Sequence, residues 1–144
     1  MIYEPQKLFD AVAVSTGTYK SAVVSARTRN LFISGGSTST AVGVITVKFN
    51  DLNENDYRAA LGIATSATPT PAQDAANDTG WKKLSVYYID EATGLQTTTG
   101  TIEVGAAGTF SFRVKKGPMR IRLEYAWSSG AGDLSAMANA NEVA

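Results

Sequence analysis

The sequence predicts an all-β fold, an antiparallel β-sandwich of jelly-roll type with about eight or nine short strands. Two observations predict this fold class. In residues 109–114, Phe110, Phe112 and Val114 alternate with polar or small residues, and a strand with this period buries one face and exposes the other. Turns that contain glycine also recur about every 8–12 residues, as they do in sandwiches.

Each expected strand is a run of β-branched, aromatic or alternating residues that ends at a turn signal. Gly35 and Gly36 are expected to end the third strand, and Gly100 is a candidate bulge position. The expected strands cover residues 10–15, 19–25, 29–34, 41–49, 81–89, 96–104, 109–114, 119–127 and 133–138. Alternation within them predicts a core that includes Leu31, Ile33, Val47, Leu84, Val86, Phe110, Phe112, Ile121 and Leu123.

Three segments fall outside this strand pattern, in a chain whose 144 residues fit one domain. The N-terminal arm, residues 1–9, is apolar around Pro5. Residues 50–80 are expected to form a long inserted loop, in which residues 58–64 can make one or two helical turns. Residues 139–144 are expected to fray, because they carry little to bury.

The composition narrows the chemistry of the chain. Apolar residues make up 44% of it, enough for a hydrophobic core. The chain has no cysteine and no histidine, which excludes disulfides, thiolate and histidine catalysis and most zinc sites. Its formal net charge of +0 gives no electrostatic attraction for nucleic acid or an anionic membrane. We therefore expect no enzyme activity, no cofactor, no nucleic-acid partner and no membrane partner.

Two acidic segments match functional sites only in part. The segment from Asp51 begins like a calcium loop, but its sixth position is Asp56 instead of glycine and its twelfth is Gly62 instead of glutamate. Asp90 and Glu91 are adjacent, so they point to opposite faces and do not share a glycosidase cleft. A solvated turn is the simpler interpretation of both segments.

The aromatic and basic residues of the later strands divide between core and surface. Alternation assigns Tyr88, Tyr125 and Trp127 to the core and leaves Tyr87 as an exposed or interfacial aromatic residue. The basic residues of two neighbouring strands are interpreted as a solvated or subunit-facing polar surface. They are Arg113, Lys115, Lys116, Arg120 and Arg122.

Four short motifs follow one another in the second half of the chain. Residues 81–84 read Trp-Lys-Lys-Leu, residues 108–112 read Gly-Thr-Phe-Ser-Phe, residues 119–122 read Met-Arg-Ile-Arg after a Gly-Pro turn, and residues 130–135 read Gly-Ala-Gly-Asp-Leu-Ser. This order resembles the small β-sandwich virion proteins of tailed bacteriophages, especially head decoration and accessory proteins. The resemblance implies a virion location after synthesis in the host cytoplasm, no catalytic residues, and arms that contact the capsid.

The expected function is that of a non-enzymatic structural virion protein, a capsid decoration, cement or head accessory protein. It is expected to bind the capsid or other virion proteins and to form a homo-oligomer, with a trimer favoured. The arm 1–9 and the loop 50–80 are expected to make these contacts, because their apolar side chains need a surface to cover. Deleting residues 1–9 is then expected to weaken assembly more than folding. The interface candidates are Ile2, Tyr3, Leu8, Phe9, Leu52, Tyr57, Leu61, Ile63 and Tyr87.

A second function stays open from the sequence. An exposed row of aromatic residues would make the chain a carbohydrate-binding module or the receptor-binding domain of a phage virion. A stable trimer without glycan binding favours the structural role, and a monomer with exposed aromatics favours the carbohydrate-binding one. An enzyme is a third interpretation, but no spacing of carboxylates or of serine and lysine supports it.

Overall fold

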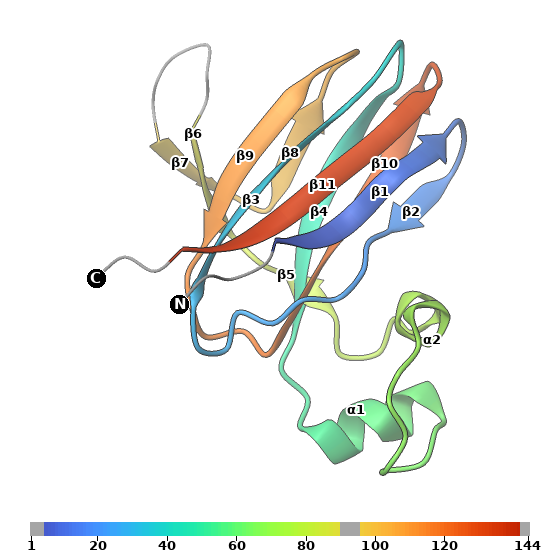
Figure 1. Ribbon diagram of the computed structural model, residues 1–144, viewed down its shortest axis with the longest axis vertical. Coiled ribbons are helices and arrows are strands. Elements are labelled where there is room, and N and C mark those ends of the chain that lie inside the picture. Colours follow the sequence, from blue (N-terminus) through green and yellow to red (C-terminus); the bar gives the residue numbers. More distant parts are fainter. Residues whose placement is uncertain (1–4, 90–95, 142–144) are drawn as a thin grey trace.

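Two antiparallel sheets form the body of the protein, which confirms the predicted all-β sandwich (Figure 1). The structure is a computed structural model that describes residues 5–89 and 96–141. Within those ranges, neither helix is long and apolar enough to cross a membrane. The elements are β1 (Gln6–Val14), β2 (Thr18–Lys20), β3 (Asn30–Ser37), β4 (Val42–Asn50), α1 (Glu54–Leu61), α2 (Pro71–Ala76), β5 (Lys82–Lys83), β6 (Val86–Ile89), β7 (Gln96–Thr99), β8 (Thr101–Val104), β9 (Thr109–Val114), β10 (Arg120–Ser129) and β11 (Gly132–Asn141).

The described residues give more strands than expected because two predicted strands divide between the sheets. The larger sheet has the order β1-β11-β3-β9-β6-β7, and the smaller has the order β2-β10-β4-β5, with β8 also paired to β4. Residues 81–89 therefore supply β5 to the smaller sheet and β6 to the larger. Residues 96–104 supply β7 to the larger sheet and β8 to the smaller, and Gly100 lies where the chain crosses. A glycine suits such a bend because it has no side chain to pack.

The core lies between the two sheets and agrees with the alternation of the sequence. All the predicted core residues are buried except Leu84, which is partly exposed and packs against the core. Tyr125 is fully buried, while Tyr88 and Trp127 are partly buried against the same cluster. These three aromatic residues are on the side of the strands that alternation predicts.

Gly35 and Gly36 lie inside a strand, so the expected break there is wrong. The predicted strand 29–34 continues to Ser37 as β3, which pairs with β11 on one side and β9 on the other. A Cβ atom on Gly35 would lie 2.8 Å from the ring of Phe110 and 2.8 Å from the Cα atom of Ala136. Glycine at this position therefore makes room for the neighbouring strands.

The first described residues do not form a free arm, which corrects the expectation for residues 6–9. These residues begin β1, which pairs with β11. Leu8 and Phe9 are both buried, with 4% and 3% of their surface exposed. The register shifts between Lys7 and Phe9, and such a bulge allows consecutive side chains to point inward. Leu8 and Phe9 are thus core residues and are not free to form an interface, while Ile2 and Tyr3 lie outside the described residues.

Two other strand ends differ from the expectation. β11 continues to Asn141, and residues 139–141 pair with residues 30–32 of β3, so these three residues are not frayed. Residues 142–144 lie outside the described residues. The predicted strand 19–25 is shorter, because β2 covers only Thr18–Lys20 and Val24 then makes an isolated bridge to Ile121.

Residues 51–80 form two short helices where a loop was expected, and we call this segment the helical excursion. The side chain of Asn53 accepts a backbone N–H at the start of α1, so the calcium-like segment is a capped helix start. Gly62 ends α1 with a φ of 73°, a left-handed conformation that glycine adopts readily. Thr70 and Gln73 make a reciprocal capping box at the start of α2. Figure 1 shows both helices beyond one end of the sandwich, near β5.

Candidate functional site

The first half of β10 is buried on both faces. Alternate residues point into the core, and the residues between them point to the outer face of the smaller sheet. Arg120 and Arg122 lie on that outer face, yet only 7% and 0% of their surface is exposed, because the helical excursion covers them. The expected solvated or subunit-facing basic surface is therefore wrong for these two residues. Arg113, Lys115 and Lys116 are exposed, as expected.

Arg122 joins the smaller sheet to the end of α2. Its Nη1 donates to the backbone oxygens of Asp74 and Asn77, both at 2.9 Å. The last carbonyls of a helix lack full hydrogen bonding within the helix, and here the guanidinium donates to them. Its Nε and Nη2 lie 2.9 and 2.8 Å from one carboxylate oxygen of Glu124, and Nη2 also lies 3.2 Å from Asp78. Charge-assisted hydrogen bonds of this kind are the strong ones in proteins.

Arg120 joins the same sheet to the start of α1. Its Nη1 donates to the backbone oxygen of Leu52 at 2.6 Å, and its Nη2 donates to Glu54 at 2.9 Å. The other carboxylate oxygen of Glu54 accepts from Arg58 at 2.8 Å. Glu54 also lies in the first turn of α1, where a negative charge is favourable next to the helix dipole.

Two aromatic rings complete the contact between the arginines and the excursion. The guanidinium carbon of Arg120 lies 3.9 Å from the ring centre of Tyr57, and that of Arg122 lies 4.2 Å from the ring of Trp81. The two rings meet edge to face at 6.4 Å, an orientation that aromatic pairs prefer. We call Arg120, Arg122, Tyr57 and Trp81 the arginine clamp. Tyr57, an interface candidate, is only 2% exposed and is therefore an internal residue.

The hydroxyl of Tyr57 adds a second link to α2. It donates to a carboxylate oxygen of Asp74 at 2.6 Å. Burial, and then the hydrogen bond to Asp74, raise the pKa of Tyr57 far above its ordinary value. The phenol therefore keeps its proton and remains a donor. The indole nitrogen of Trp81 is buried and makes no hydrogen bond within the described residues.

Two lysines extend the contacts at the edge of the clamp. Lys20 donates to Asp78 at 2.7 Å and to the backbone oxygen of Ala75 at 3.0 Å. The hydrogen bond from Lys20 lowers the pKa of Asp78 below its ordinary value. Lys48 lies 3.5 Å from Glu124, the carboxylate that also pairs with Arg122. Lys20 is thus a third cation of the smaller sheet that faces acceptors on the excursion, while Lys48 pairs with Glu124 within the sheet.

The arrangement of the clamp holds two segments of the chain together. Its cations face carboxylates, carbonyls and aromatic rings of the same chain, which is how buried arginines are satisfied. Across residues 5–89 and 96–141, no group of three Asp, Glu, His or Cys side chains can hold a metal ion. The sequence signal for the clamp is the alternation of Arg120, Arg122 and Glu124 on one strand, together with the aromatic and acidic residues of the excursion.

The other interface candidates of the excursion are partly exposed. Leu52 packs on Gly80, where a Cβ atom would lie 2.8 Å from Leu52 Cδ1. Leu61 and Ile63 flank Gly62 at the end of α1, and both are partly exposed. The backbone N–H of Ile63 donates to the carbonyl of Arg58 at 3.1 Å, which fixes the turn after the helix. Leu61 and Ile63, which we call the excursion tip, are therefore held in place.

Tyr87, the remaining candidate, is partly exposed on the outer face of the larger sheet. The ammonium nitrogen of Lys115 lies 5.2 Å from its ring centre, a distance at which a cation is attracted to an aromatic face. The acidic pair Asp90 and Glu91 lies outside the described residues.

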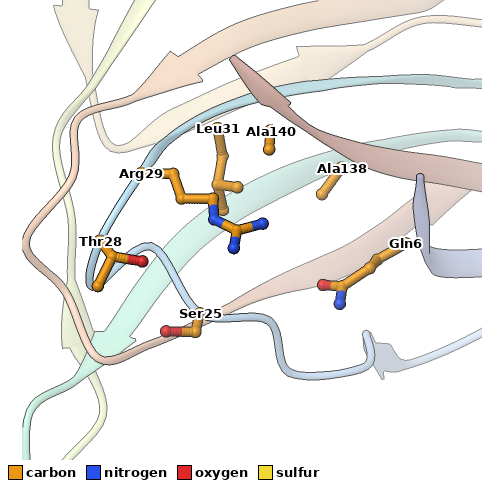
Figure 2. Close-up of a pocket in the computed structure, with 7 residues that line it drawn as sticks. All are labelled: Gln6, Ser25, Thr28, Arg29, Leu31, Ala138 and Ala140. Carbon is orange, nitrogen blue, oxygen red and sulfur yellow. The ribbon is translucent and has the colours of Figure 1, made fainter. Parts of the chain in front are cut away.

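The described surface includes two hollows of different size. The larger, of about 420 Å³, is at the end of the sandwich where β1 begins and is drawn in Figure 2. The smaller, of about 240 Å³, lies beside the clamp against Tyr57, Asp74 and Arg120.

Comparisons with known proteins give no family for this chain. No protein-family model, no curated protein and no solved structure matches it.

Proposed function

We propose that this chain is a non-enzymatic structural protein of a bacteriophage virion, a capsid decoration or head accessory protein that docks through its helical excursion. The observation that carries the proposal is the anchoring of the excursion. A docking element must hold its contact residues in place, since ordering a flexible segment on binding costs affinity. The clamp fixes both helices on the sandwich and leaves the excursion tip partly exposed.

The support comes from the excursion and not from the N-terminal residues. Leu8 and Phe9 fill the core, so they are not available to a capsid. The excursion lies beyond one end of the sandwich (Figure 1), where a larger particle can approach it. The resemblance of residues 81–138 to decoration and accessory proteins supports the same role. Self-association, with a trimer favoured, belongs to this proposal.

The test is binding of the protein to heads of its phage prepared without it. The double variant Leu61→Ser, Ile63→Ser removes the apolar tip, and we expect it to lose most of its co-sedimentation with the heads while its far-UV circular dichroism stays that of the folded protein. The control is Thr65→Ala, Ser66→Ala, which changes two exposed residues of the adjoining turn. Full binding by the tip variant would contradict docking through the excursion, and no binding by the wild type would contradict the virion role.

A second candidate is carbohydrate or receptor binding on the outer face of the larger sheet. Phe32, Arg113 and Tyr87 lie in one row there, because Phe32 pairs with Arg113 and Arg113 pairs with Tyr87. Both aromatic residues are partly exposed, and an exposed aromatic ring offers a flat apolar face on which a sugar can stack. Binding in a glycan screen that is lost in Tyr87→Ala and kept in the tip variant would favour this function.

A further inference from the structure

The smaller hollow lies between the excursion and the sandwich, and we call it the clamp hollow. Two residues of the arginine clamp line it, Tyr57 and Arg120, and they are only 2% and 7% exposed. The apolar side chains of the lining are Val23, Val24, Pro69 and Met119. The volume of about 240 Å³ is below the range of about 300–1,000 Å³ that is usual for free small ligands. The clamp hollow is therefore of a size for one side chain of a larger partner.

Asp74 gives the clamp hollow an acceptor without a cationic partner. One of its carboxylate oxygens accepts from the hydroxyl of Tyr57 at 2.6 Å, which holds the carboxylate in place. Arg122 donates to the backbone oxygen of Asp74. Within the described residues, the other carboxylate oxygen accepts no hydrogen bond, and no cation forms an ion pair with this carboxylate. Glu54, the second acid of the lining, is already paired with Arg120.

We propose that the clamp hollow receives the side chain of a lysine from the capsid partner. An ammonium group can bond to a single carboxylate oxygen, whereas a guanidinium pairs best with both oxygens at once. One oxygen of Asp74 already accepts from Tyr57, and this favours lysine over arginine. The methylene stem of a lysine packs along apolar side chains while its charge reaches an acceptor. The capsid as the source of the lysine rests on the docking role proposed above, while the ammonium chemistry rests on the hollow alone.

The first experiment is an NMR titration that follows the methyl groups of Val23, Val24 and Met119. The probe is Nα-acetyl-lysine amide, compared with the same compound acetylated on its side-chain nitrogen and with Nα-acetyl-arginine amide. Acetylation removes a charge-assisted hydrogen bond, so we expect about tenfold weaker binding of the acetylated compound, and weaker binding of the arginine compound. Equal binding of the charged and acetylated lysine compounds would overturn the site. Equal or tighter binding of the arginine compound would overturn the choice of lysine.

Matched variants decide whether Asp74 is responsible. Asp74→Asn keeps an oxygen for the hydroxyl of Tyr57 but removes the charge, so we expect it to bind the lysine compound about tenfold more weakly. Glu103→Gln removes an exposed acid of β8 outside the lining and stays within about twofold of the wild type. Equal affinities of the two variants would overturn the proposal. Should Asp74→Asn alter the whole spectrum, the comparison of the charged and acetylated compounds on the wild type decides alone.

Co-sedimentation with phage heads separates this site from the docking role. We expect Asp74→Asn to lose most of its binding to heads and Glu103→Gln to keep it. If Asp74→Asn binds heads as the wild type does while the tip variant does not, the capsid lysine is overturned and the docking role stands. If the wild type binds the lysine compound but no heads, the docking role and its capsid lysine are contradicted while the ammonium site stands.

Discussion

Arg122 is a fully buried cation with partners from both α2 and its own strand. Desolvating a guanidinium is expensive, and only complete pairing offsets the penalty. Here the partners are the carbonyls of Asp74 and Asn77 and the carboxylates of Asp78 and Glu124. Removing the cation therefore takes the guanidinium away from the buried carbonyl of Asn77 and leaves the largely buried Glu124 with only Lys48, at 3.5 Å, as a cationic partner.

The first prediction is that Arg122→Met destabilises the protein strongly. Methionine fills a similar space, so the expected loss of about 3–5 kcal/mol reflects the broken pairing. We expect Arg122→Lys to lose less stability than Arg122→Met but to remain less stable than the wild type, because a single ammonium group cannot donate to Glu124 and to the carbonyls at the end of α2 at the same time. The free energy of unfolding in urea measures both. The control is Arg113→Met, an exposed residue of β9, with an expected change within about 0.5 kcal/mol. Equal effects in the two arginines would refute the clamp.

The second prediction concerns alkaline pH and Tyr57. Its pKa is raised in the folded protein, so above an unfolded tyrosine pKa of about 10 the unfolded state loses a proton that the folded state keeps. Stability is therefore full below that pH and falls as the pH rises. Burial also raises the pKa of Tyr125, which contributes in the same direction. In Tyr57→Phe we expect a shallower fall, measured as the free energy of unfolding at increasing pH above neutrality. An unchanged slope would show that Tyr57 titrates normally.

At the level of single residues, the sequence predicts which side chains face the core but not which outward ones are covered. Ile121 and Leu123 follow from alternation, and both are buried. Alternation places Arg120 and Arg122 on the opposite face of the same strand, and an arginine on an outer face is usually exposed to solvent. The residues that cover the two arginines belong to the excursion, about 45–70 positions away in the sequence. Local alternation does not reach that far, so the burial of the arginines is visible only in the folded structure.

Strand β3 depends on glycine because it lies between two other strands of the larger sheet. Gly35 pairs with Ala136 of β11 and with Phe110 of β9. The ring of Phe110 occupies the space next to Gly35 that a side chain would need, since a Cβ atom added to Gly35 would lie only 2.8 Å from that ring.

The third prediction is that Gly35→Ala destabilises the sandwich. Its Cβ atom would meet the backbone oxygen of Ser135 and approach Phe110 at 2.8 Å, and overpacking of this kind costs about 1–3 kcal/mol. Gly105→Ala is the control, since nothing lies within 4 Å of a Cβ atom there. Thermal unfolding compares the two, and equal melting temperatures would show that β3 shifts to accept the methyl group.

Element boundaries show the limit of local patterns. Residues 96–104 look like one threonine-rich strand, because both β7 and β8 have the same propensity. Their division between two sheets depends on tertiary pairing, and only Gly100 signals it. The helices of the excursion are eight and six residues long, too short to be stable alone. Asn53 and Thr70 cap these helices, but the same residue types are common in turns, so they do not predict a helix by themselves. The contacts of the clamp stabilise both helices on the sandwich.

At the scale of the whole molecule, the first strand closes the core. The fourth prediction is that deleting residues 1–9 lowers stability by about 3–6 kcal/mol, because burying Leu8 and Phe9 contributes about 1.5–3 kcal/mol each. This reverses the order expected from the sequence, in which assembly suffers first. Deleting residues 1–5 leaves β1 whole and is the control. A shift in melting temperature that is the same for both deletions would show that β1 is dispensable.

The fifth prediction is that the excursion and the sandwich unfold together. The clamp places buried charges of β10 against the helices, so lifting the excursion alone would leave these charges without their partners. In Trp127→Phe the fluorescence of Trp81 reports the clamp, and far-UV circular dichroism of the same sample reports the sheets. We expect both signals to change at one urea midpoint, as in a two-state transition.

An earlier midpoint for Trp81 would mean that the excursion detaches while the sandwich stays folded. The tip residues Leu61 and Ile63 would then belong to a mobile segment that must be ordered on binding, at a cost to affinity. A single midpoint instead means that the tip keeps its position as long as the sandwich is folded. The docking role requires the second result, because a tip held by the clamp can meet a larger particle without first losing conformational entropy.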